Sequence, residues 1–370
     1  MSDHVIWFSE LSIADKKKVG GKNASLGELT NNMGHSGIRS PVGFAITVSA
    51  FQNFLEENKL NLKISEVTKD VDKNDSSSIS EASAVITSLI RAASLSDSLI
   101  SEIKLGLDTL QGDAPFLSVA VRSSALDEDS NSASFAGQQK TLLNVSDLDN
   151  VLNAVIEVYA SLFSERSLSY RLHQGLSISE AAMSVGIQKM VRSETGAAGV
   201  MFTLDTESGF DKVVFVTSAF GLGETVVQGV VNPDEFYVHK ASLEAGRPAI
   251  LRRSLGAKAI KMVHSKNAEG LATIESVRVD RAQRLTFSIS DEDINLLANQ
   301  AIAIEKHYKK AMDIEWAKDG ESGEIFIVQA RPETVKNLTS KNSMERYLLK
   351  ETGTPLCEGR SVGHKIGSGS

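Results

Sequence analysis

Three short strand-like segments follow one another between residues 184 and 217, with little chain between them. The runs SVGIQKMV and AAGVMFTL flank a turn that contains Glu194 and Gly196, and residues 213–217 add a third run. Apolar runs of this length that are separated by turn residues are typical of strands that pair with one another. We therefore expect an antiparallel sheet in this part of the chain.

Other segments place apolar residues at helical spacing. The clearest are residues 147–174, which Gly175 is placed to end, and residues 290–310. Residues 84–110 also show helical spacing, whereas the serine-rich stretch of residues 71–83 predicts a surface loop. Helices and antiparallel strands together predict an α+β fold, and 370 residues are enough for two subdomains.

The charge balance and the single cysteine limit the partners and the compartment. A formal net charge of -8 argues against nucleic acid as a partner, because nucleic-acid-binding proteins normally carry a basic excess on one face. Cys357 has no second cysteine with which to form an internal disulfide. The first residues lack the features of a signal peptide, and no apolar run reaches the length of about 18 residues that crosses a membrane. We expect a cytoplasmic protein without membrane contact.

Two acids share one face of a predicted hairpin. Residues 312–331 read as the strand MDIEWA, the turn KDGESG and the strand EIFIVQAR. Because side chains alternate across a strand, Asp313 and Glu315 lie on the same side, as do Gln329 and Arg331 on the returning strand. Two acids, an amide and a guanidinium suit Mg²⁺ bound together with a phosphate. A solvated strand face, or a structural ion pair between Arg331 and an acid, are the alternatives.

Three glycine-bearing segments are candidates for contact with a nucleotide. In GGKNASLGEL two glycines and Lys22 precede a helical run, where an anion is favoured, although Asn23 after the lysine rules out a Walker P-loop. Arg122 ends a strand-like run, and the loop SFAGQQ around Gly137 follows it. GLGE places Glu224 where it could accept hydrogen bonds from a ribose. Taken alone, each segment is also compatible with an ordinary turn.

In chain order, five of these segments resemble a known family. GGKNASLGEL, VRSS…SFAGQQ, IQKMVRSE, GLGETVVQGVVNPDEFYVHK and DIEWAKDG…IFIVQARPET are similar to the N-terminal ATP-grasp nucleotide-binding domain of phosphoenolpyruvate synthases (pyruvate, water dikinases). The resemblance implies two α+β subdomains with the nucleotide in the cleft between them. It places the first subdomain at residues 1–188 and the second, with the metal-binding hairpin, at 189–340. Residues 341–370 then form a linker and the start of a phosphohistidine domain.

The resemblance also implies an activity. In the family, ATP, pyruvate and water become AMP, phosphoenolpyruvate and phosphate through a phosphorylated histidine on a swivelling domain. This chain would transfer the phosphoryl group from Mg-ATP to that histidine. Its sequence contains neither a T-C-H-A-type phosphohistidine motif nor a pyruvate-binding barrel. We therefore expect that it binds ATP, that its partners are the phosphohistidine domain and the barrel, and that it has no turnover by itself.

The resemblance assigns a role to each candidate residue. Lys22, Arg122 and Arg331 are the catalytic cations that hold the ATP phosphates, and the loop around Gly137 covers them. Gln188, Met190 and Val191 frame the adenine, and Glu224 and Gln228 meet the ribose side. The ligands of Mg²⁺ are Glu315 and Gln329, with Asp313 as a supporting acid.

Two other functions remain as alternatives. The chain could belong to a related dikinase with the same ATP-binding module, such as a rifamycin phosphotransferase or pyruvate, phosphate dikinase, although the segment VNPDEFYVHK favours the synthase. It could also be a nucleotide-binding module without catalytic activity. Both metal ligands and the phosphate-binding cations are present, which counts against the second alternative. The sequence DEDSNSAS, where the family often has a proline, predicts a more mobile loop before SFAGQQ.

Overall fold

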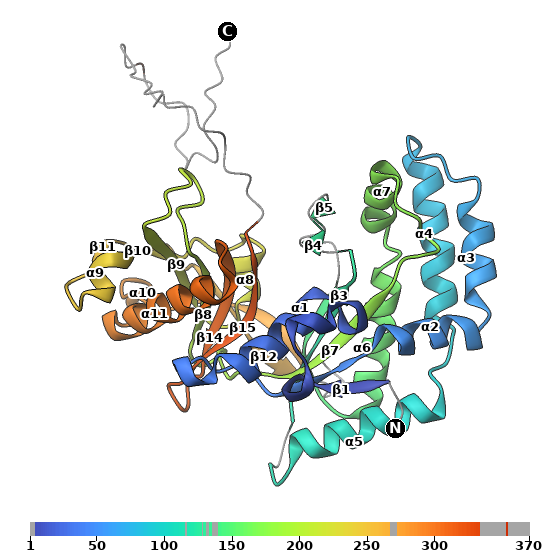
Figure 1. The fold of residues 1–370 in the computed structure, drawn as a ribbon, viewed down its shortest axis with the longest axis horizontal. Coiled ribbons are helices and arrows are strands. Elements are labelled where there is room, and N and C mark those ends of the chain that lie inside the picture. Colours follow the sequence, from blue (N-terminus) through green and yellow to red (C-terminus); the bar gives the residue numbers. More distant parts are fainter. Residues whose placement is uncertain are drawn as a thin grey trace.

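The chain forms two lobes, each built on an antiparallel sheet (Figure 1). The computed structural model describes residues 4–114, 117–127, 129–130, 133–134, 140–266, 272–333 and 353. No helix in these residues combines the length and the apolar character needed to cross a membrane.

The first lobe contains a five-stranded sheet and the helices that pack on it. Its strands, in spatial order, are β1 (Val5–Trp7), β2 (Gly43–Ile46), β7 (Met183–Lys189), β3 (Val119–Ala125) and β6 (Thr141–Val145). Its helices are α2 (Val48–Glu57), α3 (Leu60–Thr68), α4 (Ser76–Arg91), α5 (Asp97–Gln111), α6 (Leu148–Ser161) and α7 (Glu165–Gln174). Short pieces complete it: η1 (Phe8–Glu10), η2 (Ile13–Asp15), β4 (Asp129–Ser130) and β5 (Ala133–Ser134). A further short piece, η3 (Gly34–Ser36), lies between Met33 and Ile38, whose side chains are in the core of the second lobe.

The second lobe contains a six-stranded sheet, several short helices and one long helix. In spatial order its strands are β11 (Ile250–Ser254), β10 (Asp234–His239), β9 (Val213–Phe220), β8 (Ala197–Phe202), β14 (Met312–Lys318) and β15 (Ile325–Pro332). Its helices are α8 (Glu224–Val227), α9 (Lys240–Glu244), α10 (Arg281–Arg284) and α11 (Asp291–Tyr308). A separate hairpin of β12 (Ile260–Lys266) and β13 (Ala272–Arg278) extends to the first lobe, where Asn144 donates a hydrogen bond of 2.7 Å to the carbonyl of Thr273.

One helix belongs to both lobes. The N-terminal half of α1 (Lys16–Asn32) packs through Ala24 and Leu26 against the start of the chain, whereas Leu29 lies in the core of the second lobe. Ser25 donates a hydrogen bond of 2.6 Å to the carbonyl of Ala330, and Glu28 lies 2.7 Å from the ring of His307. Helix α1 therefore connects the first residues of the chain to the hairpin β14–β15 of the second lobe.

The predicted antiparallel sheet of three consecutive strands is only partly correct. Strands β8 and β9 pair antiparallel as expected, but β7 lies in the other sheet, between β2 and β3. The segment between β7 and β8 crosses from one lobe to the other instead of forming a hairpin turn. Strand type could be inferred from the local pattern, whereas the choice of partner depends on residues far away in the sequence.

Helix boundaries needed further correction. The loop predicted for residues 71–83 ends at Asp75, which caps α4, because Ile79 and Ala82 extend the buried face of that helix despite the serines between them. The helical segments predicted at 84–110 and 147–174 are each broken. Ser96 caps a new helix after the first break and Ser164 after the second. Serine side chains compete for backbone N–H groups, which favours a new helix start.

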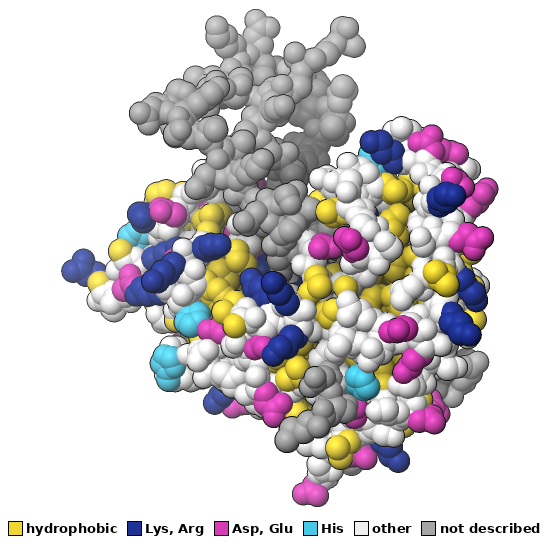
Figure 2. Space-filling view, turned by 45° about the vertical axis from the view of Figure 1, so that its right-hand side comes forward, with side chains coloured by type: hydrophobic (Ala, Val, Ile, Leu, Met, Phe, Trp, Pro, Cys, Tyr) yellow, Lys and Arg dark blue, Asp and Glu magenta, His cyan; other side chains and the backbone are white. Residues whose placement is uncertain are grey.

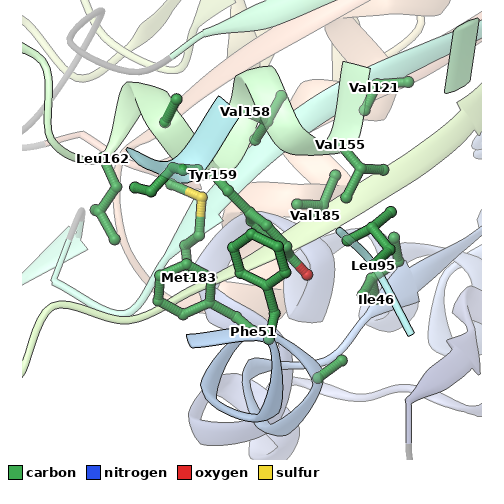
Figure 3. Close-up of a cluster of buried hydrophobic side chains, with 14 of the residues drawn as sticks. Ile46, Phe51, Leu95, Val121, Val155, Val158, Tyr159, Leu162, Met183 and Val185 are labelled. Atoms are coloured by element: carbon green, nitrogen blue, oxygen red, sulfur yellow. The ribbon is translucent and has the colours of Figure 1, made fainter. Parts of the chain in front are cut away.

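The core of the first lobe contains a tyrosine whose hydroxyl has no hydrogen-bond partner among the described residues. The Tyr159 ring packs against Phe51, with 4.8 Å between centroids, close to Met183 (Figure 3). Tyr159→Phe removes only this unsatisfied hydroxyl and is expected to raise the free energy of unfolding by about 1 kcal/mol or leave it unchanged. Tyr159→Ala, the control, should lower it by about 3–5 kcal/mol. Urea unfolding measures both, and a clear loss of stability in Tyr159→Phe would contradict the placement of the hydroxyl.

Candidate functional site

A cleft of about 790 Å³ lies between the two sheets. It is lined by ten of the twelve residues singled out from the sequence: Lys22, Arg122, Gln188, Met190, Val191, Glu224, Gln228, Glu315, Gln329 and Arg331. Asp313 does not line it, and Gly137 lies outside the described residues. The structure therefore brings together residues that are up to about three hundred positions apart in the sequence.

The hairpin β14–β15 supplies one wall of the cleft, and its predicted alternation is confirmed. Met312, Ile314 and Trp316 are buried on one face, while Glu315 pairs with Gln329 and Asp313 with Arg331 across the strands. A β-bulge interrupts the register after Glu315, because the next residue pairs with Ile327. The extra residue is Val328, whose carbonyl faces the first lobe.

The side chain of Arg122 crosses the cleft from β3 to this wall. Its Nη2 donates hydrogen bonds to Glu315 Oε2 at 3.1 Å and to Gln329 Oε1 at 2.9 Å. Its Nη1 donates to the Val328 carbonyl at 3.0 Å and to Gln188 Oε1 at 3.4 Å. Gln329 Nε2 in turn donates to Glu315 Oε1 at 3.1 Å, which fixes the orientation of the amide.

Glu315 and Gln329 therefore direct one oxygen each at a single positively charged nitrogen. Such convergence is what two ligands of a metal ion require, and carboxylate and amide oxygens suit Mg²⁺. In the described residues no group of three or more His, Cys, Asp or Glu could hold a metal. A magnesium ion at this point would take its other ligands from phosphate oxygens and water, which is the usual arrangement for Mg²⁺ bound with a nucleotide. The residues present fit such an ion.

Asp313 and Arg331 form an ion pair beside this point. Arg331 Nε and Nη2 lie 2.9 and 2.7 Å from Asp313 Oδ2, so the structural ion pair considered from the sequence is present. Burial raises the pKa of the Asp313 carboxyl to about 6, an effect that the Arg331 guanidinium only partly offsets. The nearby charge of Glu315 acts in the same direction as burial. Asp313 is thus in a position to orient Arg331, which lines the cleft.

Lys22 follows a kink in α1. Gly20 adopts a φ of 71°, and a Cβ atom there would lie 2.2 Å from the carbonyl oxygen of Ser124, so both conformation and space require glycine. Three residues later the backbone N–H of Asn23 donates to Ser124 Oγ at 3.2 Å, and its side chain donates to Ser184 at 2.9 Å. These contacts fix the start of the second helical segment, so that Lys22 lies at the edge of the cleft.

The GLGE segment is a strand-to-helix turn that also lines the cleft. Strand β9 ends at Phe220, and α8 begins at Glu224. Glu224 Oε1 accepts a hydrogen bond of 2.6 Å from Gln228. Burial raises the pKa of the Glu224 carboxyl, the bond from Gln228 lowers it, and the charge of Glu315 raises it again. The segment is therefore an ordinary strand-to-helix turn that also carries an acid into the cleft, and the contact of Glu224 with a ribose stays a prediction.

The cleft is more basic than the rest of the chain. Six lysines and arginines line it against two acids, Glu224 and Glu315, although the chain carries a net charge of -8. Elsewhere the two signs are mixed, as Figure 2 shows for the right-hand part of the visible face. Lys140, Arg166 and Lys189 among these cations were not predicted. Lys140 directly follows the SFAGQQ loop, which was a usable signal, but the sequence around Arg166 gave none. A local excess of positive charge attracts anions.

A comparison with models of protein families matches residues 16–351 to the family described as pyruvate phosphate dikinase, AMP/ATP-binding domain. This match includes all of the residues that line the cleft. The chain belongs to this family.

Members of the family are also found among curated proteins. The chain is 54% identical over 369 residues to a phosphoenolpyruvate synthase of Pseudomonas aeruginosa. The aligned residues cover 100% of this chain and 47% of that protein. It is 50% identical to one of Escherichia coli, over 99% of this chain and 46% of that protein. It is 39% identical to a probable phosphoenolpyruvate synthase of Staphylothermus marinus, over 90% of this chain and 41% of that protein. The chain thus spans about half the length of the curated relatives that it matches.

The pKa of Asp313 predicts how stability depends on pH. Because this pKa lies above the ordinary value of 3.8, the folded protein keeps a proton that the unfolded chain loses, and the carboxyl stabilises the fold only at low pH. The difference in unfolding free energy between wild type and Asp313→Asn is expected to fall as pH rises from about 4 to 7, by no more than about 3 kcal/mol.

Asp319 in the same hairpin provides the opposite control. Burial raises the pKa of Asp319, but backbone N–H groups that include those of Ser322 and Glu321 hold this pKa below its usual value. The difference between wild type and Asp319→Asn should therefore rise with pH over the acidic range. Urea unfolding at a series of pH values measures both slopes. A flat or rising difference for Asp313→Asn would show that its carboxyl is not held in a buried environment.

Proposed function

We propose that the chain is the ATP-binding portion of a phosphoenolpyruvate synthase, a pyruvate, water dikinase. It binds Mg-ATP in the cleft between its lobes and transfers a phosphoryl group to a histidine on a separate domain. The observation that carries this proposal is the convergence of Glu315 and Gln329 on one cationic point, within a basic cleft of a chain from the AMP/ATP-binding family.

The fold that we propose is the ATP-grasp fold. Two antiparallel sheets that enclose a cleft, with the second sheet ending in the hairpin β14–β15, support it. We propose residues 1–188 and 189–340 as the two subdomains and 341–370 as the linker to the phosphohistidine domain. The strands of the first sheet come from residues 5–189 and those of the second from 197–332, which supports the first boundary. The linker lies outside the described residues.

Each group of residues has a separate role in this proposal. Lys22, Arg122 and Arg331 hold the phosphates, and Asp313 orients Arg331. Gln188, Met190 and Val191 frame the adenine. The backbone N–H of Met190 donates a hydrogen bond of 2.9 Å to the carbonyl of Ser118, which fixes this segment in the wall of the cleft. Glu224 and Gln228 face the ribose, and Glu315 and Gln329 hold Mg²⁺.

Phosphoryl transfer asks a protein mainly for positioning and for charge stabilisation. The transferred group spreads negative charge over its oxygens, and cations that are already in place stabilise that charge. When bound, Mg²⁺ would supply further charge neutralisation between the phosphates. The residues of this chain contribute the guanidinium and ammonium groups, the orientation of the nucleotide, and the exclusion of water by closely approaching sheets.

The full reaction that we propose converts ATP, pyruvate and water into AMP, phosphoenolpyruvate and phosphate, in the cytoplasm, where these substrates are available. It needs the phosphohistidine domain and the pyruvate-binding barrel, so this chain by itself should form no phosphoenolpyruvate. The names of the relatives support the synthase over a rifamycin phosphotransferase or a pyruvate, phosphate dikinase. The metal-ligand pair in a basic cleft supports catalysis over simple nucleotide binding.

Calorimetry of nucleotide binding tests this proposal. ATP with Mg²⁺ is expected to bind wild type at least about tenfold more tightly than it binds Glu315→Gln, which corresponds to about 1.4 kcal/mol. Without Mg²⁺ the two proteins should differ much less, because Glu315 acts through the metal. Glu321→Gln, in the exposed turn of the same hairpin, serves as the control and should behave as wild type. Equal affinities of wild type and Glu315→Gln under all conditions would remove the metal site from the proposal.

A further inference from the structure

The guanidinium of Arg122 lies where the two proposed metal ligands converge. Its Nη2 contacts Glu315 Oε2 at 3.1 Å and Gln329 Oε1 at 2.9 Å, and the Arg122 side chain is 14% exposed. A metal bound to these two oxygens would need the space that Nη2 fills. One positively charged group therefore already satisfies both ligands in the nucleotide-free chain.

We propose that Arg122 is a built-in counter-ion that excludes free metal from this site until a nucleotide binds. Arg122 and Glu315 carry opposite unit charges, so the pair is neutral before any ligand enters. A divalent cation alone would add two positive charges beside a guanidinium, which is unfavourable in a partly buried site. A metal with a triphosphate adds negative charge as well, so Arg122 can exchange the carboxylate for a phosphate oxygen.

The geometry of Arg122 suits such an exchange. Only Nη2 contacts the two ligands, whereas Nη1 is held by the Val328 carbonyl at 3.0 Å and by Gln188 Oε1 at 3.4 Å. The bulge that turns the Val328 carbonyl toward the first lobe thus gives Arg122 an anchor that is independent of the metal ligands. The guanidinium can give up Glu315 and Gln329 while it keeps its place at the edge of the cleft.

This inference rests on the proposed function, since it assumes that metal and nucleotide share the cleft. It adds that the two bind together, with Arg122 as the reason. Arg122 therefore has two roles in sequence: it neutralises Glu315 when the cleft is free, and it binds phosphate when the nucleotide is present.

Titration of the nucleotide-free chain with Mn²⁺, followed by electron paramagnetic resonance, tests the proposal. Arg122→Met keeps the length of the side chain and removes its charge, and it is expected to bind Mn²⁺ at least about tenfold more tightly than wild type. Arg122→Lys keeps a positive charge and should behave as wild type. The double variant Arg122→Met/Glu315→Gln should lose the gained site, because one of its two ligands is gone.

A matched arginine controls for the general effect of freeing a carboxylate. Arg253 pairs with Asp291 outside the cleft through two nitrogens, at 3.0 and 2.6 Å, and Arg253→Met should gain no Mn²⁺ site. Circular dichroism confirms that each variant folds. If Arg122→Met does not fold, the Mn²⁺ titration of wild type decides by itself. Wild type is then expected to show saturable Mn²⁺ binding only when a non-hydrolysable ATP analogue is present.

The possible results separate this inference from the proposed function. Saturable Mn²⁺ binding by nucleotide-free wild type, as tight as in Arg122→Met, overturns the counter-ion role. Lack of calorimetric ATP binding by wild type overturns the proposed function, whereas a gained Mn²⁺ site in Arg122→Met still supports the counter-ion role. If ATP binds and a folded Arg122→Met gains no Mn²⁺ site, only the counter-ion role is lost.

Discussion

The contact of Arg122 with the hairpin β14–β15 determines how the two lobes meet. A side chain from strand β3 of the first sheet reaches a carboxylate, an amide and a backbone carbonyl of the second. Buried polar groups are costly unless they are paired, so the facing surfaces must approach closely enough to satisfy all of them at once. This constraint explains why one end of the cleft is polar. The same contact supplies the cationic point on which Glu315 and Gln329 converge.

Helix α1 makes a second connection, and it serves the same end of the cleft. The kink at Gly20 lets the helix pass close to Ser124, and the bond of Ser25 to Ala330 attaches the helix beside the hairpin. Burial would raise the pKa of Glu28, but the amide of Ile13 and the ring of His307 hold that pKa below its usual value. Lys22 is therefore held between two fixed attachments, one in each lobe, rather than on a free loop.

Much of the site could be predicted because its residue types stand at characteristic spacing. Asp313, Glu315, Gln329 and Arg331 follow from the alternation of a single hairpin, which depends only on local sequence. The bulge at Val328 could not be predicted, because no turn residue marks it and its cause is the partner strand. The contact of Arg122 with Glu315 spans 193 positions and depends on how two lobes pack, which no local pattern encodes. Arg166 was missed for the same reason, since it enters the cleft from a helix without a motif.

The central claim is that the cleft binds a metal–nucleotide complex through the oxygens of the hairpin. Crystals grown with Mn²⁺ and a non-hydrolysable ATP analogue, measured at a wavelength where manganese scatters anomalously, test it most directly. One anomalous peak is expected within about 2.1–2.3 Å of both Glu315 and Gln329 oxygens, bridged to the phosphates. A nucleotide bound elsewhere, or a manganese peak that contacts phosphates but neither of these residues, would contradict it.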